Sequence, residues 1–312
     1  MCGIAGFLTG PNWSGDALTV ARAMGAAIAH RGPDAEGFWR DAAQGVTLCH
    51  RRLSILDLSP AGAQPMVSDS GRYVVIYNGE IYNHLELRRG LEAEGVAPAW
   101  RGHSDTETLL ALIEAHGVEY ALTRSAGMFA IALWDRRERR LTLARDRIGE
   151  KPLYYGRVGD ALVFSSELKA LRIFPGFDRT IDTQATAAFF QRAYVPAPLC
   201  IYKAVRKLPS GHSITFETNA STRQETPVAY GSLVDTIAAA KDARRETPPS
   251  LEATEALLTE VVASQTLSDV PLGAFLSGGV DSSLITALMQ KGASQPVRTF
   301  SIGFEDSHFN EA

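Results

Sequence analysis

The sequence predicts an α+β layered domain over residues 1–213 and the opening of a parallel α/β domain over residues 251–312. Three observations carry this prediction. The length of 312 residues is about twice that of a typical domain. In the first part, β-type runs alternate with turns and helices without regular βαβ order. In the second part, a strand, a glycine loop, a helix and another strand follow one another.

The first part contains short runs rich in β-branched and aromatic residues. We expect strands at Ile4–Leu8, Val46–Leu56, Tyr73–Tyr82, Met128–Trp134, Leu141–Arg145 and Ala161–Ser165. Helical spacing covers Ala17–Ala29 and recurs around Leu85 and Leu91. The clearest helix start is Ser104, because its hydroxyl can cap free N–H groups and Glu107 can reach back to it.

A proline-punctuated connector, residues 214–250, with one short helix, precedes the second part. A helical face then runs from Leu251 to Val262. The strands Val270–Leu276 and Val297–Ile302 enclose a helix over Ser282–Gln290. We expect the two strands to pair in parallel, with the helix crossing over one face of the sheet.

Composition excludes several classes of protein. The 31 Lys and Arg against 35 Asp and Glu give a net charge of −4, so no basic field exists to attract nucleic acid or anionic lipid. The longest apolar run, Met128–Trp134, is far below the roughly 18 residues of a membrane helix. Cys2, Cys49 and Cys200 are too scattered for a disulfide framework or a CxxC metal site. The N-terminus lacks the basic start of an export signal, so we expect a cytoplasmic protein without membrane or nucleic-acid partners.

Cys2 is the first candidate for chemistry. Methionine before a small residue is normally removed, which would place a thiol and an α-amine on one residue. An α-amine with a pKa near ~8 can serve as base for the thiol. Taken alone, the short N-terminal motif favours a buried structural cysteine, because motifs of this length often occur by chance.

Asn78 and Gly79 stand between two β runs. Asn-Gly in that position is the strongest short-range signal for a hairpin turn. The Asn78 amide and the Gly79 N–H could also form an oxyanion hole, which stabilises charge as a thiolate attacks a carboxamide. The two interpretations are compatible.

Two charged residues are candidates for holding a substrate. Arg51 and Arg52 point to opposite faces of an expected strand, so Arg52 could face a pocket and bind a carboxylate bidentately. Asp105 could pair with a substrate ammonium, although an acid in the first turn of a helix also complements the helix dipole. The segment His30–Asp34 is a polar turn by default.

The most specific short motif is SGGVDSS, Ser277–Ser283. It follows an apolar strand and opens a helix, so its backbone N–H groups converge on an anion. The GxxxxGK[ST] pattern occurs nowhere in the chain. The missing lysine suits a pyrophosphate leaving group better than γ-phosphoryl transfer.

Taken in order, the motifs resemble the glutamine-hydrolysing asparagine synthetase family. They are MCGIAGF, HRGPD, HRRLSILDLS, AGAQPM, YNGEIYNH, HSDTETLL, GMFAIALWD, LARDRIGEKPLYYG, FSSELKAL, KLPSGH, VPLGAFLSGGVDSS and TFSIGFED. The resemblance implies an N-terminal-nucleophile αββα sandwich with glutaminase activity. After it would come the first βαβ unit of an ATP-pyrophosphatase domain, in which aspartate is adenylated and ammonia displaces AMP.

The resemblance also implies roles for individual residues. Cys2 would be the nucleophile, and Asn78 with Gly79 would stabilise the oxyanion. The residues implied to bind glutamine are Arg52, Leu53, Ser54, Ile55, Leu56, Asn78, Gly79, Glu80 and Asp105. Those implied to bind ATP are Leu276, Ser277, Gly278, Gly279, Asp281, Ser282 and Ile302, with Asp281 near Mg²⁺. Glutamine, aspartate and ATP would be the substrates, and a homodimer is the candidate assembly.

Three alternatives remain open at this stage. The ammonia acceptor could be another carboxylate, such as a sugar acid in surface polysaccharide synthesis. The first domain could also be non-catalytic, although Cys2, Arg52, Asn78 and Asp105 argue against this. Glutaminases that feed phosphoribosylamine or glucosamine phosphate synthesis are disfavoured by the SGGVDSS motif. Because family members continue beyond Ala312, we expect this chain to hydrolyse glutamine without making asparagine, and its last part to be the least stable.

Overall fold

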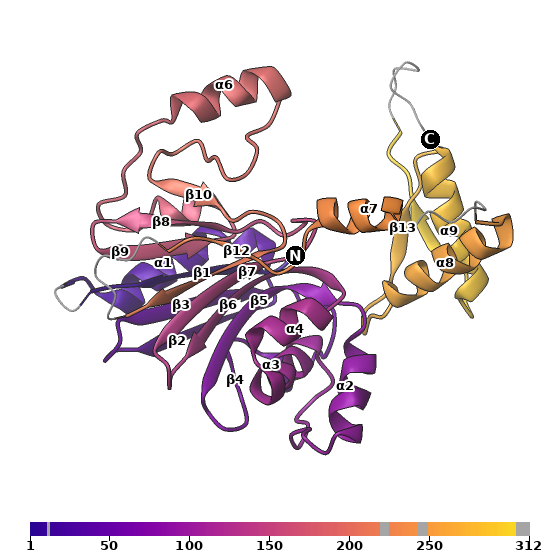
Figure 1. The fold of residues 1–312 in the computed structure, drawn as a ribbon, viewed down its shortest axis with the longest axis horizontal. Coiled ribbons are helices and arrows are strands. Elements are labelled where there is room, and N and C mark those ends of the chain that lie inside the picture. The colour runs from indigo at the N-terminus through magenta and orange to yellow at the C-terminus, as the bar shows by residue number, and fades with distance from the viewer. Residues whose placement is uncertain (11–12, 219–224, 243–248, 304–312) are drawn as a thin grey trace. The chain divides into compact units, whose positions relative to one another are not determined.

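The computed structural model describes residues 1–10, 13–218, 225–242 and 249–303, which form two compact units, residues 1–239 and 240–312. Each unit is described by itself (Figure 1). The elements are β1(Gly3–Leu8), α1(Ala17–Ala27), η1(Ala29–Arg31), β2(Ala35–Asp41), β3(Val46–Arg52), η2(Pro60–Gly62), β4(Met66–Val67), β5(Tyr73–Ile81), α2(His84–Ala93), α3(Asp105–His116), α4(Val118–Arg124), β6(Gly127–Asp135), β7(Arg140–Arg145), β8(Tyr154–Val158), β9(Ala161–Ser165), α5(Leu168–Leu171), α6(Thr183–Arg192), β10(Val205–Lys207), β11(His212–Glu217), β12(Val228–Ala229), α7(Leu233–Asp242), α8(Leu251–Ser264), β13(Gly273–Phe275), α9(Val280–Gly292) and β14(Arg298–Phe300).

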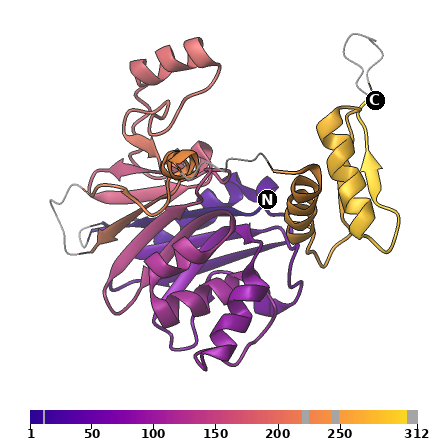
Figure 2. The same cartoon turned by 45° about the vertical axis from the view of Figure 1, so that its right-hand side comes forward.

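Two six-stranded antiparallel sheets form the first unit (Figures 1 and 2). One has the strand order β10-β8-β9-β1-β3-β2, and the other has the order β12-β11-β7-β6-β5-β4. The pairing of β11 with β7 and β12 places residues 214–217 and 228–229 in the second sheet. These residues fall in the stretch 214–250, which the sequence predicts to be a connector. The short helix expected there is α7.

Three buried apolar clusters fill the three interfaces of an αββα sandwich. One cluster, which includes Ile4, Ile76 and Trp134, lies between the sheets. The side chains that alternate with these point outward and pack under helices. Thus Phe7 on β1 belongs to the cluster with α1 and α5, and Val75 on β5 belongs to the cluster with α2, α3 and α4. The predicted fold class is therefore confirmed.

Two local predictions for the first unit are wrong. The strand expected over Val46–Leu56 ends at Arg52, because both neighbouring strands end there: Gly3 of β1 pairs with Arg51, and Ala35 of β2 pairs with Arg52. The hairpin interpretation of Asn78-Gly79 is wrong, whereas the strand expected over Tyr73–Tyr82 is confirmed. Residues Tyr73–Ile81 are one strand, paired residue for residue with β6, and the partner strand comes from far along the chain.

The helix predicted after Ser104 is confirmed as α3, with the Ser104 hydroxyl accepting from the Glu107 N–H at 3.2 Å. Glu107 does not reach back to the cap, which corrects the expected reciprocal pair. Its buried carboxylate accepts instead from the N–H groups of Arg101, at 2.9 Å, and Gly102, at 3.1 Å. Those donors and the nearby Arg88 satisfy the buried charge better than one cap N–H would.

The second unit contains the expected parallel pair. Strands β13 and β14 pair in parallel, and α9 connects them and packs alongside (Figure 2). Each strand is three residues long, shorter than predicted, and Phe275 and Phe300 are exposed. Helix α9 begins at Val280, two residues earlier than expected, because Gly279 occupies the cap position. The end of the TFSIGFED motif, residues 304–306, lies outside the described residues. Across the described residues, no helix is long and apolar enough to span a membrane.

Candidate active site

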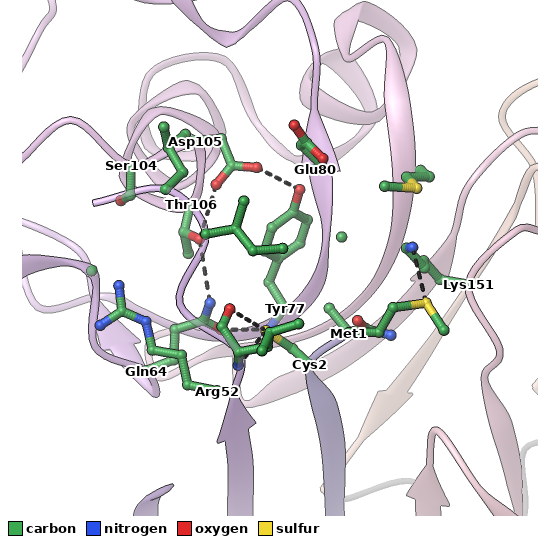
Figure 3. Close-up of a pocket in the computed structure, with 17 residues that line it drawn as sticks. Met1, Cys2, Arg52, Gln64, Tyr77, Glu80, Ser104, Asp105, Thr106 and Lys151 are labelled. Carbon is green, nitrogen blue, oxygen red and sulfur yellow. Dashed lines mark hydrogen bonds between the residues drawn. The ribbon is translucent and has the colours of Figure 1, made fainter. Parts of the chain in front are cut away.

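A cavity of about 90 Å³ opens in the first unit beside the N-terminal end of β1 (Figure 3). Its lining residues are Met1, Cys2, Arg52, Leu53, Ile55, Leu56, Gly62, Gln64, Tyr77, Asn78, Gly79, Glu80, Ser104, Asp105, Thr106, Met128 and Lys151. The structure thus gathers at one cavity every residue that the resemblance links to glutamine except Ser54. The Ser54 N–H is held by the Asp34 carboxylate at 2.8 Å, which ties its backbone to the polar turn after His30.

Cys2 lies just before β1, and its thiol contacts the backbone of Leu53. The Leu53 N–H donates to Sγ over 3.4 Å, and Sγ lies 3.6 Å from the Leu53 carbonyl oxygen. Burial raises the pKa of the Cys2 thiol, and the hydrogen bond from Leu53 opposes that shift. The thiol is therefore protonated at neutral pH until a base removes its proton, and the Leu53 N–H can stabilise the resulting thiolate.

Arg52 ends β3 and turns its buried guanidinium into the wall of the cavity. It donates to the Ser59 carbonyl at 3.2 Å and to the Asp57 carbonyl. A Cβ on Gly62 would stand 2.2 Å from Arg52 Nη2 and 2.7 Å from the Asp57 carbonyl oxygen, so a larger residue there would displace the guanidinium from its present place. Arg51 points to the opposite face of the strand and pairs with Glu36, as the alternation along a strand predicts.

Strand β5 presents backbone N–H groups along its free edge at the cavity. The Tyr77 N–H donates to Gln64 Oε1 at 2.7 Å, and the Ile81 N–H donates to Asp105 Oδ2 at 2.9 Å. Gly79 lies between them, opposite Phe129. The N–H and carbonyl of Phe129 both bond to Asp146, so the Gly79 N–H belongs to the free edge as well.

Asn78 contributes an amide nitrogen that has no hydrogen-bond partner among the described residues. Only 1 % of the residue is exposed, and within the described residues its Nδ2 is buried without a hydrogen bond. An unpaired buried donor costs about 1–3 kcal/mol, so natural structures rarely keep one without a reason. The Asn78 amide and the Gly79 N–H can together donate to an oxygen that enters the cavity.

Two carboxyl groups, those of Asp105 and Glu80, face the same cavity (Figure 3). Asp105 Oδ2 accepts from the Tyr77 hydroxyl at 2.7 Å and from the Ile81 N–H. Burial nevertheless raises the pKa of Asp105. Burial, together with the charge of Asp105, raises the pKa of Glu80 to about 7. A cation placed between the two carboxylates would relieve both desolvation and repulsion.

Several lining residues were missed by sequence reasoning. Gln64 bridges the Tyr77 N–H and the Thr106 hydroxyl, to which its Nε2 donates at 3.3 Å. Lys151 places its ammonium in the wall beside Met1. Both residues occur in motifs that carried the family resemblance, AGAQPM and LARDRIGEKPLYYG, so position within those motifs was the available signal.

In the second unit, hydrogen bonds between residues of the SGGVDSS loop fix its conformation. The Ser282 hydroxyl caps the loop by accepting from the Ser277 N–H at 3.3 Å and donating to the Gly279 carbonyl at 3.1 Å. Gly278 has a φ of 74°, which favours glycine. Leu276 precedes the loop, and its carbonyl accepts from the Ser301 hydroxyl at 2.6 Å, next to Ile302. The predicted ATP-binding residues are therefore neighbours.

Asp281 lies exposed in the first turn of α9, beside this loop. Among the described residues, no group of three His, Cys, Asp or Glu side chains could hold a metal ion. Mg²⁺ commonly needs only one or two carboxylates, because substrate phosphates and water complete its shell. Asp281 fits that arrangement.

Comparison with known proteins gives two family matches. Residues 1–227 match the glutamine amidotransferase domain family, and residues 253–312 match the asparagine synthase family. Asparagine synthetase [glutamine-hydrolyzing] 1 of Bacillus subtilis (strain 168) is 36 % identical over 100 % of this chain and 47 % of its own length. A putative asparagine synthetase [glutamine-hydrolyzing] of Mycobacterium tuberculosis (strain ATCC 25618 / H37Rv) is also 36 % identical, over 100 % of this chain and 49 % of its own. The chain thus spans about half the length of these relatives.

Other matches widen the comparison. Amidase chry2 of Gibberella zeae is 33 % identical over 93 % of this chain and 43 % of its own. The solved structure of glutamine phosphoribosylpyrophosphate amidotransferase from B. subtilis, complexed with ADP and GMP, superposes with a TM-score of 0.52 at 16 % identity. That match covers 97 % of this chain and 67 % of the other. A structure described as the allosteric regulatory enzyme of purine biosynthesis gives a TM-score of 0.54 at 15 % identity, with coverage of 97 % and 66 %. These two structures share the fold.

Proposed function

The chain belongs to the glutamine-hydrolysing asparagine synthetase family, and on that premise we propose that its first unit hydrolyses glutamine at Cys2 and supplies ammonia to an ATP-activated aspartate. The observation that carries the glutaminase half is the buried Asn78 Nδ2, which has no partner in the described part of the chain and lies at the same cavity as the Cys2 thiol. A nucleophile and an unused oxyanion donor facing one small cavity are what acyl transfer needs.

Removal of Met1 frees the α-amine of Cys2, which takes the thiol proton. The sulfur attacks the side-chain amide carbon of glutamine, and the oxygen that becomes negative is held by Asn78 Nδ2 and the Gly79 N–H. The ammonium formed on Cys2 returns the proton to the leaving nitrogen, and ammonia departs. Water then hydrolyses the thioester, which releases glutamate and restores the thiol.

The main-chain end of glutamine is held away from the bond that breaks. Asp105 and Glu80 together suit its α-ammonium, since a cation there offsets the repulsion between the two carboxylates. Arg52 suits its α-carboxylate, because two of its five N–H donors are engaged by loop carbonyls and the others remain for a ligand. Leu53, Ile55 and Leu56 supply the adjacent cavity wall.

The direct test is glutamate release from glutamine by the protein and by its Cys2→Ala variant. We expect release by the wild-type protein and none above background by the variant. Cys49→Ala is the matched control, because Cys49 is buried on the far side of the first sheet, in the cluster under α1. Mass spectrometry must show loss of Met1 in active protein. Activity with Met1 retained would refute the mechanism.

The synthetase half of the proposal uses the second unit. The SGGVDSS loop would hold the ATP phosphates with its N–H groups and the start of α9, and Asp281 would share a Mg²⁺ with those phosphates. The bound ion would neutralise phosphate charge as pyrophosphate leaves. Leu276 and Ile302 would contact the adenosine.

The acceptor is proposed from the match of residues 253–312 to the asparagine synthase family. The similarity to amidase chry2 makes a different carboxylate acceptor the second candidate. The two are separated by offering aspartate or a sugar acid with ATP and ¹⁵N-amide glutamine, and measuring labelled product and pyrophosphate. Label in asparagine supports the first candidate and would overturn the expectation that this chain makes no asparagine. Label only in the sugar amide supports the second candidate, and glutamate release with label in neither product agrees with that expectation.

A further inference from the structure

Lys151 is a buried cation that the mechanism above does not use. Only 5 % of the residue is exposed, and its Nζ lies 3.3 Å from the Met1 sulfur. Within the described ranges Lys151 makes no ion pair. Burying an ammonium without a carboxylate partner is costly, so its place in the cavity wall calls for an explanation.

The backbone around Lys151 is fixed by a dense set of hydrogen bonds. The Asp146 carboxylate accepts from the N–H groups of Ile148, at 3.1 Å, Glu150, at 3.0 Å, and Lys151, at 3.0 Å. Arg145 Nε donates to the Lys151 carbonyl at 2.7 Å. These hydrogen bonds fix the backbone of Lys151, and therefore the position from which its side chain extends toward Met1.

The position of Lys151 indicates which end of the site it serves. In Figure 3 it lies on the Met1 side of Cys2, whereas Arg52, Gln64 and Asp105 lie on the other side. Loss of Met1 would remove the thioether that the Lys151 ammonium contacts, and Cys2, the next residue, would carry the new α-amine. We propose that Lys151 is a positioning residue that holds a positive charge beside this amine and keeps it in the neutral form that accepts the thiol proton. The inference rests on the proposed function.

Neighbouring charges support this assignment. In the chain with Met1 present, burial lowers the pKa of the N-terminal amine. The charges of Arg31 and Lys151 act in the same direction, and those of Cys2 and Asp34 oppose it. Arg31 is already engaged by the Cys2 carbonyl, at 2.9 Å, and by Glu167.

The charged groups that face Lys151 itself are Glu150, Arg31, Asp146 and Glu80. Of these, the Asp146 carboxylate is saturated by backbone N–H groups. Glu80, with a pKa near 7, is half-protonated at neutral pH. Arg31 and Lys151 both lower the pKa of the amine, Arg31 by more than Lys151, and Lys151 is the one of the two that makes no ion pair within the described ranges.

The test compares Lys151→Met with Lys151→Arg by measuring kcat at saturating glutamine across pH. Because kcat reports the enzyme–substrate complex, the fall of kcat at low pH follows protonation of the Cys2 α-amine in that complex. We expect Lys151→Met to move the midpoint of that limb upward by about one pH unit, a tenfold loss of rate below it, with little change at high pH. Lys151→Arg should keep the wild-type midpoint. The same comparison in a Glu80→Gln background removes any contribution from Glu80.

A second readout does not depend on activity. In Cys2→Ala protein, labelling of the N-terminal amine by an acylating reagent, followed by mass spectrometry across pH, gives the pKa of that amine. Adding Lys151→Met should raise it, and Lys151→Gln serves if the methionine variant does not fold. An unchanged midpoint and unchanged labelling would overturn the role of Lys151. An active Cys2→Ala variant or retained Met1 would instead overturn the proposed function.

Discussion

The Tyr77 hydroxyl donates a 2.7 Å hydrogen bond to the carboxylate of Asp105. Tyr77 comes from β5 and Asp105 from the first turn of α3, so this bond joins the sheet to the helix that covers it. Burial, together with the charge of Asp105, raises the pKa of Tyr77 well above its ordinary value, so the phenol stays protonated and remains a donor. The bond lowers the pKa of Asp105 and so opposes the upward shift that burial causes.

Tyr77→Phe should therefore weaken glutamine binding more than it slows the chemistry. Without the hydroxyl the pKa of Asp105 rises further, and a smaller fraction of Asp105 is ionised to hold the substrate ammonium. We expect KM near pH 7 to rise about tenfold or more, since a hydrogen bond to a charged group contributes ~1.5–3 kcal/mol. Tyr155→Phe, on β8 and outside the cavity, is the control. A lower kcat with unchanged KM would contradict this account.

The raised pKa of Glu80 predicts that glutamine binding depends on pH. Its pKa of about 7 in the free protein lies above the ordinary value of 4.5, so the carboxyl gains a proton as pH falls through 7. The neutral form cannot pair with an ammonium, and KM should therefore rise as pH falls from about 8 to 6. Glu80→Gln should have a higher KM throughout and lose the step near pH 7. The measurement is KM at several pH values; a wild-type step that survives in Glu80→Gln would assign it to another group.

The candidate site was more predictable from sequence than the strands that build it. The structure places four predicted residues at one cavity: Cys2, Arg52, Asn78 and Asp105. They could be recognised from sequence because each belongs to a short motif. The strand at Ala35–Asp41 was missed because it is only partly buried and lacks a continuous apolar run. Asn78-Gly79 suggested a hairpin, yet β6 supplies the partner strand from about fifty residues away in sequence. Such pairing depends on tertiary contacts that a local pattern does not contain.

His50 gives a prediction about stability. It is fully buried on β3, and its Nε2 lies 3.0 Å from the Tyr77 carbonyl of the other sheet. Burial lowers its pKa from 6.5 to about 4. Because the unfolded chain binds a proton between pH 6.5 and 4 and the folded chain does not, the free energy of unfolding should fall as pH decreases through that window. The contribution of His50 is on the order of 3 kcal/mol by pH 4.

Urea unfolding at pH 7.5 and pH 5 measures this effect. His50→Gln is the matched variant, since a glutamine amide can still donate to the Tyr77 carbonyl but does not titrate. We expect the wild-type protein to lose more stability than the variant between the two pH values. Equal losses would show that other groups, and not His50, govern the acid sensitivity.

Asn78 gives the sharpest test of the catalytic arrangement. Its Nδ2 is buried and unpaired within the described residues, so Asn78→Ala removes no protein hydrogen bond from that nitrogen. If the amide donates a hydrogen bond only to the oxyanion of the transition state, the variant should keep its KM and lose kcat by on the order of 10²-fold or more. This is the effect of deleting one oxyanion donor. Alkylation of Cys2 by iodoacetamide should proceed at the wild-type rate, because no oxyanion forms in that reaction. Equal loss of both rates would show that Asn78 supports the thiol or the strand, and a near-wild-type kcat would leave the Gly79 N–H as the donor that matters.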